Sequence, residues 1–238
     1  MPNLANARQM LVAALWAGLW AGLFLTAIQR LQVLPLIQQA ELYEVQATAI
    51  PSHTPAEHAV PHQAEETAWQ PQEGWERTAY TAVANISLAV GFALLLAAAG
   101  NLRGGLSGWR KGLAWGLAGY VAFFVAPSLG LPPELPGTQA ALLKDRQFWW
   151  VLTVADTALG LWLLAFAKTS TNKLFGLVLL VSPHLLGAPQ PEFHDSAAPA
   201  ELARRFIIAT TIANALFWLV LGGLIGRFFA PHTDNKPV

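Results

Sequence analysis

The chain has 238 residues, of which 54% are hydrophobic and only 12% are charged, about half the charged fraction of a typical soluble domain. Fourteen Lys and Arg residues balance fourteen Asp and Glu residues, which excludes the global basic field of a nucleic-acid-binding protein. The chain has no cysteine, so disulfides, thiolate metal sites and cysteine nucleophiles are excluded as well. The composition predicts an all-α, polytopic membrane bundle.

The apolar segments predict a single membrane domain with about six transmembrane helices, and five as the alternative count. A hydrocarbon core of about 30 Å requires roughly 20 apolar residues in a helix. The expected spans are residues 10–29, 80–99, 112–129, 148–167, 174–188 and 206–229. The first is longer than a signal-peptide core and is followed by Gln29 and Arg30, so it is expected to remain uncleaved. The fifth is short and contains Pro183, which predicts a tilted, broken or re-entrant segment.

The distribution of Lys and Arg over the short loops predicts the orientation in the membrane. Six spans place most of these residues on one side: Arg8, Arg103, Arg110, Lys111, Lys168, Lys173, Arg227 and Lys236. Both termini are therefore expected to be cytoplasmic, in the inner membrane of a bacterium. Arg204 and Arg205 fall on the other side and count against this orientation.

The longest segment outside the expected spans, residues 30–78, is predicted to face outward and contains seven Glu and three His residues. Residues 34–44 can extend the first helix beyond the membrane, whereas three prolines within residues 47–63 predict a flexible segment. The three histidines are His53, His58 and His62. Imidazole and carboxylate together bind divalent cobalt, nickel or zinc, but the spacing is loose. A weak metal-capture site and a polar tether with incidental histidines are both open interpretations.

A second group of candidate metal ligands surrounds the fifth span. Pro183 loosens the helix and can free backbone carbonyls beside His184. His194 follows shortly afterwards, between Glu192 and Asp195. One interpretation is a site where a dehydrated cation enters the membrane, and the other is an interfacial histidine that caps a helix end.

Asp156, near the middle of the fourth span, is the third candidate. A charged carboxylate at the centre of a membrane helix costs about 2.5–3.5 kcal/mol on insertion scales, so it should face the bundle interior and find a partner. Asn85 and Asn214 lie on polar stripes of two other spans. These groups form either a polar conduction path or hydrogen-bonded contacts between helices.

Glu134, the fourth candidate, lies in the proline-rich loop of residues 130–137. It is expected either to bind a cation at an outer mouth or to pair with Arg146, for which Asp145 is the alternative partner. The adjacent Trp149 and Trp150 are typical of an interfacial anchor.

No phosphate-binding glycine loop, His-Glu-x-x-His motif or nucleophile elbow is present, so we expect neither an ATPase of that kind nor an enzyme.

Five strings carry a resemblance to a known family: Ala-Pro-Ser-Leu-Gly-Leu-Pro-Pro-Glu-Leu-Pro-Gly at 126–137, Arg-Gln-Phe-Trp-Trp at 146–150, Pro-His-Leu-Leu-Gly-Ala-Pro at 183–189, Trp-x-Pro-x-x-Gly-Trp-Glu-Arg-Thr at 69–78 and Asn-Ala-Leu-Phe-Trp at 214–218. With them the chain resembles the CbtA family of predicted cobalt transporter subunits.

The resemblance implies a membrane subunit of a cobalt uptake system linked to cobalamin supply, and a small single-span, histidine-containing partner subunit, CbtB. Cobalt(II) would be the transported ion, and no prosthetic group is expected. A homo-oligomer is also compatible with the sequence. The alternatives are a non-transporting membrane scaffold or regulator of a partner permease, and a membrane enzyme without an identifiable substrate.

Overall fold

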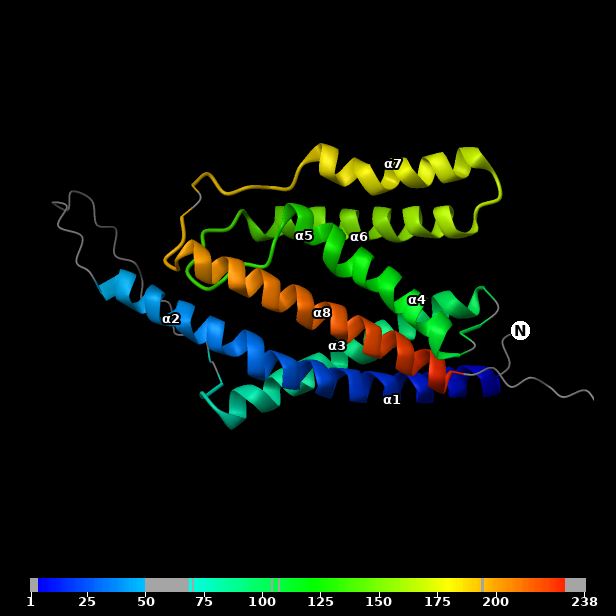
Figure 1. Cartoon of the computed structure of the whole chain (residues 1–238), viewed down its shortest axis with the longest axis horizontal. Coiled ribbons are helices and arrows are strands. Elements are labelled where there is room, and N and C mark those ends of the chain that lie inside the picture. The colour runs from blue at the N-terminus through cyan, green and yellow to red at the C-terminus, as the bar shows by residue number, and fades with distance from the viewer. Residues whose placement is uncertain are drawn as a thin grey trace, which may run out of the picture.

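The computed structural model describes residues 4–49, 69, 71–103, 105–106, 108–193 and 195–229 (Figure 1). These residues form helices joined by short connections, and no β-strand occurs among them. One isolated bridge pairs Thr138 with Ser196. The predicted all-α fold class is therefore confirmed.

The first part of the chain forms one long, nearly continuous helix. It consists of α1 (Leu4–Ile28), a π-helical turn η1 (Gln29–Val33) and α2 (Leu34–Ala49). Residues 34–44 thus extend the first helix as predicted, and the helical part of the segment 30–78 is longer than expected. A π-helical turn places one extra residue in the helix, and such turns are frequent at functional sites.

The remaining helices are α3 (Trp75–Asn101), α4 (Trp109–Tyr120), η2 (Val121–Val125), α5 (Ala126–Gly130), α6 (Leu143–Phe166), α7 (Ser170–Leu186) and α8 (Ala200–Phe228). Within the described ranges, five helical segments are long and apolar enough to cross a membrane: Ala7–Ala47, Trp75–Asn101, Trp109–Gly130, Leu143–Phe166 and Ala200–Phe228. They correspond to the five longer spans of the prediction.

Helix α7 is the short segment of the prediction and has 17 residues. At 1.5 Å per residue it is about 25 Å long, less than a hydrocarbon core of about 30 Å. It runs back along α6, and an extended segment then leads to the start of α8 (Figure 1). The chain therefore reverses direction at each of these helices. Whether α7 spans the membrane completely stays a prediction.

The helices pack in pairs, α1 with α3, α4 with α8 and α6 with α7, and α1 also contacts α8. The α1–α3 contact is made of small residues, which let the backbones approach closely. Gly18 lies against Val90 and Gly22 against Ile86, and the fully buried side chains of the two helices include Ala14, Ala17, Ala21, Ala89, Ala93 and Ala97. Larger side chains from α8, among them Phe217 and Trp218, fill the centre of the bundle.

The two ends of the bundle differ in charge. The start of α1, the α3–α4 and α6–α7 connections and the end of α8 share one end (Figure 1). These segments contain Arg8, Arg103, Arg110, Lys111, Lys168, Lys173 and Arg227, and no Asp or Glu in the described residues. The opposite end holds α2 and the loops 131–142 and 187–199, which are joined by hydrogen bonds from Gln139 N to Asp195 O (3.0 Å) and from Ala197 N to Gly137 O (3.1 Å).

Candidate functional site

Asp156 lies at the contact between α6 and α7, as expected for a carboxylate in the middle of a span. Its Oδ2 accepts a hydrogen bond from the Ser182 hydroxyl on α7 at 3.2 Å. The same hydroxyl lies 3.2 Å from the Leu179 carbonyl oxygen. That carbonyl is four residues before Pro183, which has no N–H to donate to it. The proline therefore creates a local polar site inside the α6–α7 pair.

His184 and Trp149 continue this polar line toward the end of α7. The Trp149 indole N–H donates to the Pro183 carbonyl at 3.1 Å, in a buried position. The His184 ring, which is partly buried, contacts the indole edge-on, with ring centroids 6.0 Å apart. Trp149 is only 5% exposed, whereas Trp150 is 38% exposed, so only Trp150 matches the expected interfacial anchor. We call the line formed by Asp156, Ser182, His184 and Trp149 the α6–α7 seam.

The α6–α7 seam does not form a closed coordination shell. Trp149 and Asp156 are seven residues apart on α6, which corresponds to about 10 Å along the helix axis. On α7, Ser182 bonds to Asp156, and His184, two residues further along, lies beside Trp149. In the described part of the chain, no three His, Asp or Glu side chains lie close enough together to hold a metal ion.

Glu134 is held by Arg146, which starts from the first turn of α6. The Glu134 Oε2 and Arg146 Nη2 atoms are 2.8 Å apart, and both side chains are about three-quarters buried, with 27% and 28% exposure. The expected ion pair is therefore present. This pairing occupies one carboxylate oxygen, and the metal-binding interpretation of Glu134 stays a prediction.

The other four predicted metal ligands cannot be placed. His53, His58, His62 and His194 lie outside the described residues.

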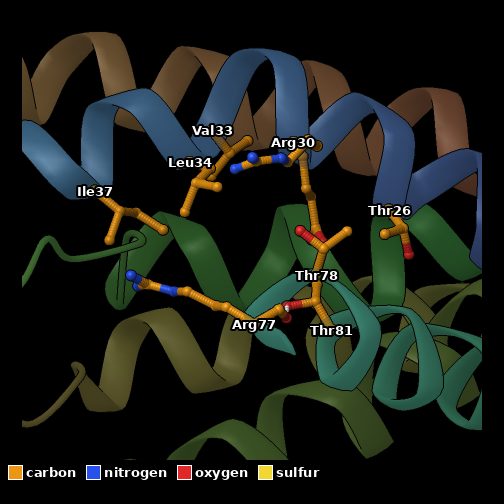
Figure 2. A pocket seen from close by; sticks show the side chains of 9 residues that line it. Thr26, Arg30, Val33, Leu34, Ile37, Arg77, Thr78 and Thr81 are labelled. Atoms are coloured by element: carbon orange, nitrogen blue, oxygen red, sulfur yellow. Dashed lines mark hydrogen bonds between the residues drawn. The ribbon is translucent and has the colours of Figure 1, made fainter. Parts of the chain in front are cut away.

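A second polar site, which the sequence analysis did not identify, lies between the first long helix and α3. It is a cavity of about 230 Å³ next to the π-helical turn η1. Figure 2 shows Arg30 on the wall formed by the first long helix and Arg77 on the facing wall formed by α3. Its lining residues are Thr26, Gln29, Arg30, Val33, Leu34, Ile37, Arg77, Thr78 and Thr81. Two arginines on facing walls make this cavity a poor site for a bare divalent cation.

Arg77, one of the lining residues, belongs to an ion-pair network. Arg77 pairs with Glu41 of α2, with Nη2 and Oε1 2.8 Å apart, and also with Glu73 just before α3. The hydrogen bond from the Arg77 guanidinium holds the pKa of Glu73 below its ordinary value. The network therefore ties α2 to the beginning of α3.

The buried amide of Asn85 bonds to two of the residues that line this cavity. Its Nδ2 donates to Gln29 Oε1 at 2.7 Å and lies 3.0 Å from Thr26 Oγ1, both on the first long helix. Asn214 instead donates to the Thr210 carbonyl of its own helix at 2.9 Å. Asn85, Asp156 and Asn214 are thus bonded in three separate places, which favours the interpretation of helix–helix and local contacts over one shared path.

Comparison with known proteins decides the family. The model of the CbtA family, described as a probable cobalt transporter subunit, matches residues 7–230. The chain belongs to the CbtA family. The match includes every described helix except the first three residues of α1, so it covers the α6–α7 seam, the Glu134–Arg146 pair and the cavity beside η1. No curated protein and no solved structure matches the chain.

Members of this family are described as transporter subunits, and the chain has several helices suited to crossing a membrane. It is accordingly a membrane protein of a cobalt transport family. The resemblance in the loop strings is confirmed at the level of the family.

Proposed function

We propose that the chain is the membrane subunit of a divalent-metal uptake system that transports cobalt(II) for cobalamin supply, without an ATPase of its own. The observation that carries the proposal is the match of nearly the whole chain to a cobalt transporter subunit family. The α6–α7 seam supports it, because it places a carboxylate, a hydroxyl and an imidazole between two apolar helices.

In this proposal, cobalt reaches the bundle at the end where the outer loops gather, and His53, His58, His62, Glu134 and His194 raise its local concentration. It then passes His184 and Asp156 in turn. Since no three His, Asp or Glu side chains gather in the described part of the chain, each position offers few protein ligands, and binding is weak enough for release. His and carboxylate ligands must lose protons to bind metal, so uptake should decrease at mildly acidic pH.

Cobalt uptake by cells that express the full chain tests the seam. Asp156→Asn and His184→Gln should each reduce uptake at least several-fold at equal protein abundance in the membrane. Asp145→Asn, on the first turn of the same helix, is the matched control and should leave uptake unchanged. Unchanged uptake in an Asp156→Asn, His184→Gln double variant would remove the seam from the proposal.

A non-transporting scaffold or regulatory subunit is the second candidate, and the bonding of Asn85 to the first long helix favours it because a polar intramembrane group there acts as a structural contact. Reconstitution of the purified chain in proteoliposomes separates the two functions. Cobalt flux that depends on Asp156 supports the permease. Flux that appears only after a partner subunit is added, and does not depend on Asp156, supports the scaffold.

The word subunit in the family description implies a partner, and a small single-span, histidine-containing CbtB-like chain is our proposal for it. We place the chain in the bacterial inner membrane with both termini cytoplasmic. The concentration of Lys and Arg at the end that holds the start of α1 and the end of α8 supports this orientation. Cysteines introduced at the α3–α4 connection should react with an impermeant reagent only after the cells are opened.

A further inference from the structure

An apolar groove lies between α3, α4 and α6, away from the α6–α7 seam. It has a volume of about 380 Å³. Its lining residues are Leu95, Leu96, Ala99, Ala114, Trp115, Ala118, Gly119, Ala122, Phe123, Ala158, Leu161, Trp162, Ala165 and Phe166. Leu95, Ala114 and Ala158 are exposed on the surface of the bundle, so the groove opens toward the surrounding membrane.

The depth of the groove corresponds to one leaflet of a bilayer. On α4 and η2 its lining extends from Ala114 to Phe123, and on α6 from Ala158 to Phe166. At 1.5 Å per residue these stretches are about 12–14 Å long, close to half of a hydrocarbon core of about 30 Å. A transmembrane helix from a partner would need an apolar surface along the whole core, whereas an acyl chain of one leaflet needs this length.

Arg103 marks the end of the groove that lies at the basic end of the bundle. Its guanidinium carbon is 4.3 Å from the Phe166 ring centroid and 5.8 Å from that of Trp162, two of the lining rings. A guanidinium stacked on ring faces keeps its N–H groups directed outward in its own plane. No carboxylate pairs with Arg103 among the described residues. Its donors are therefore available to an oxyanion beside the groove.

The surroundings of Arg103 favour an anionic ligand. Arg110 and Lys111 begin the adjacent α4, Lys168 follows the end of α6, and the described part of this end contains no Asp or Glu. Basic residues near the membrane surface attract anionic lipid headgroups by about 1 kcal/mol each, which is about fivefold in affinity. The apolar groove thus matches an acyl chain, and the arginine at its end matches the phosphate group of the same lipid.

We propose that an anionic phospholipid binds here, with one acyl chain in the groove between α3, α4 and α6 and its phosphate on Arg103. The bound lipid fills the space between three helices that otherwise make few direct contacts with one another. It would stabilise the position of α6, which carries one side of the α6–α7 seam. The site needs no cobalt, so its test is independent of transport.

Native mass spectrometry of the full chain released from detergent micelles tests the proposal, with dioleoyl phosphatidylglycerol and dioleoyl phosphatidylcholine as probes. The unmodified chain should retain phosphatidylglycerol in preference to phosphatidylcholine. Arg103→Gln should lower the affinity for phosphatidylglycerol about fivefold, toward that of phosphatidylcholine. Ala118→Leu, which places a larger side chain in the groove, should weaken both lipids.

Matched controls are Lys144→Gln, a charge removed at the opposite end of α6, and Ala84→Leu, an enlargement on the exposed face of α3. Both should bind lipid like the unmodified chain. Arg103→Lys keeps the positive charge and is the control for misfolding of Arg103→Gln. It should retain part of the preference for phosphatidylglycerol over phosphatidylcholine.

Three results would overturn the proposal. The first is equal retention of the two lipids by the unmodified chain. The second is unchanged phosphatidylglycerol binding by both Arg103→Gln and Ala118→Leu. The third is binding to the isolated chain that disappears in an assembly with a co-purified subunit, because this would assign the groove to a partner helix.

Discussion

The closest contact between helices predicts a sharp effect of one added methyl group. Where α4 crosses α8, a Cβ atom added at Gly222 would lie 2.4 Å from the Gly112 carbonyl oxygen and 2.8 Å from the Gly116 Cα. Both neighbours are backbone atoms, which cannot rotate away. The two helices must therefore separate by at least 0.6 Å to reach 3.0 Å, below which real Cβ contacts are essentially not observed.

Gly222→Ala should accordingly lower the free energy of unfolding by about 1–3 kcal/mol, the usual range for overpacking in a well-packed interior. Gly223→Ala is the matched control, because its Cβ would meet only the Leu113 Cδ2 at 3.6 Å, an ordinary contact. Replacing a helical glycine by alanine without a clash is neutral or stabilises by up to about 1 kcal/mol. Unfolding in mixed detergent micelles, followed by tryptophan fluorescence, measures both variants. Equal stability of the two would refute the packing of α4 on α8 described above.

Three further predictions concern single polar groups. Trp149→Phe removes a buried hydrogen bond and should destabilise the chain by about 1 kcal/mol in the same unfolding assay, while Trp150→Phe should have little effect. Asn85→Leu removes the interhelical amide and should destabilise by about 0.6 kcal/mol without changing cobalt uptake, and a selective loss of uptake would contradict a structural role. The folded-state pKa of Glu73 is lowered, so its contribution to stability is present above the ordinary carboxyl pKa and is lost as the pH falls through the lower value. Glu73→Gln should therefore remove this dependence of the unfolding free energy on pH between neutral and strongly acidic pH. If the variant keeps the same dependence, the Arg77 ion pair is not its source.

The fold could be predicted to a large extent because membrane crossing depends on length and apolar composition, which are local properties of the sequence. The five longer spans and the extension of the first helix into α2 were predicted for this reason. The α4–α8 contact depends on which faces of two distant helices meet. The sequence does contain a signal for this contact, because Gly112 and Gly116, and likewise Gly222 and Gly226, are four residues apart. This spacing is typical of closely packed helix pairs.

The site could be predicted only in part. Asp156 was expected to have a partner because an isolated intramembrane carboxylate is unfavourable, but the identity of Ser182 depends on how α7 packs on α6. The cavity beside η1 was missed because Gln29 and Arg30 were interpreted as the end of the first span, and a π-helical turn has no sequence signal of its own. The burial of Trp149 could not be separated from the exposure of Trp150, since neighbouring residues of identical type differ only in the face they occupy.

The backbone becomes irregular directly after α7, a helix of 17 residues. Backbone groups outside a helix are tolerated at membrane depth only where protein or water covers them. Here the loops 131–142 and 187–199 bond to each other, from Gln139 N to Asp195 O and from Ala197 N to Gly137 O, and the Gln190 side chain lies 3.4 Å from the Gly130 and Ala188 carbonyl oxygens. The segment after Leu186 thus bonds to another loop instead of continuing the helix. In the proposed transport function, this arrangement gives an ion access to the imidazole at the end of α7 while the apolar surfaces of α6 and α7 remain packed.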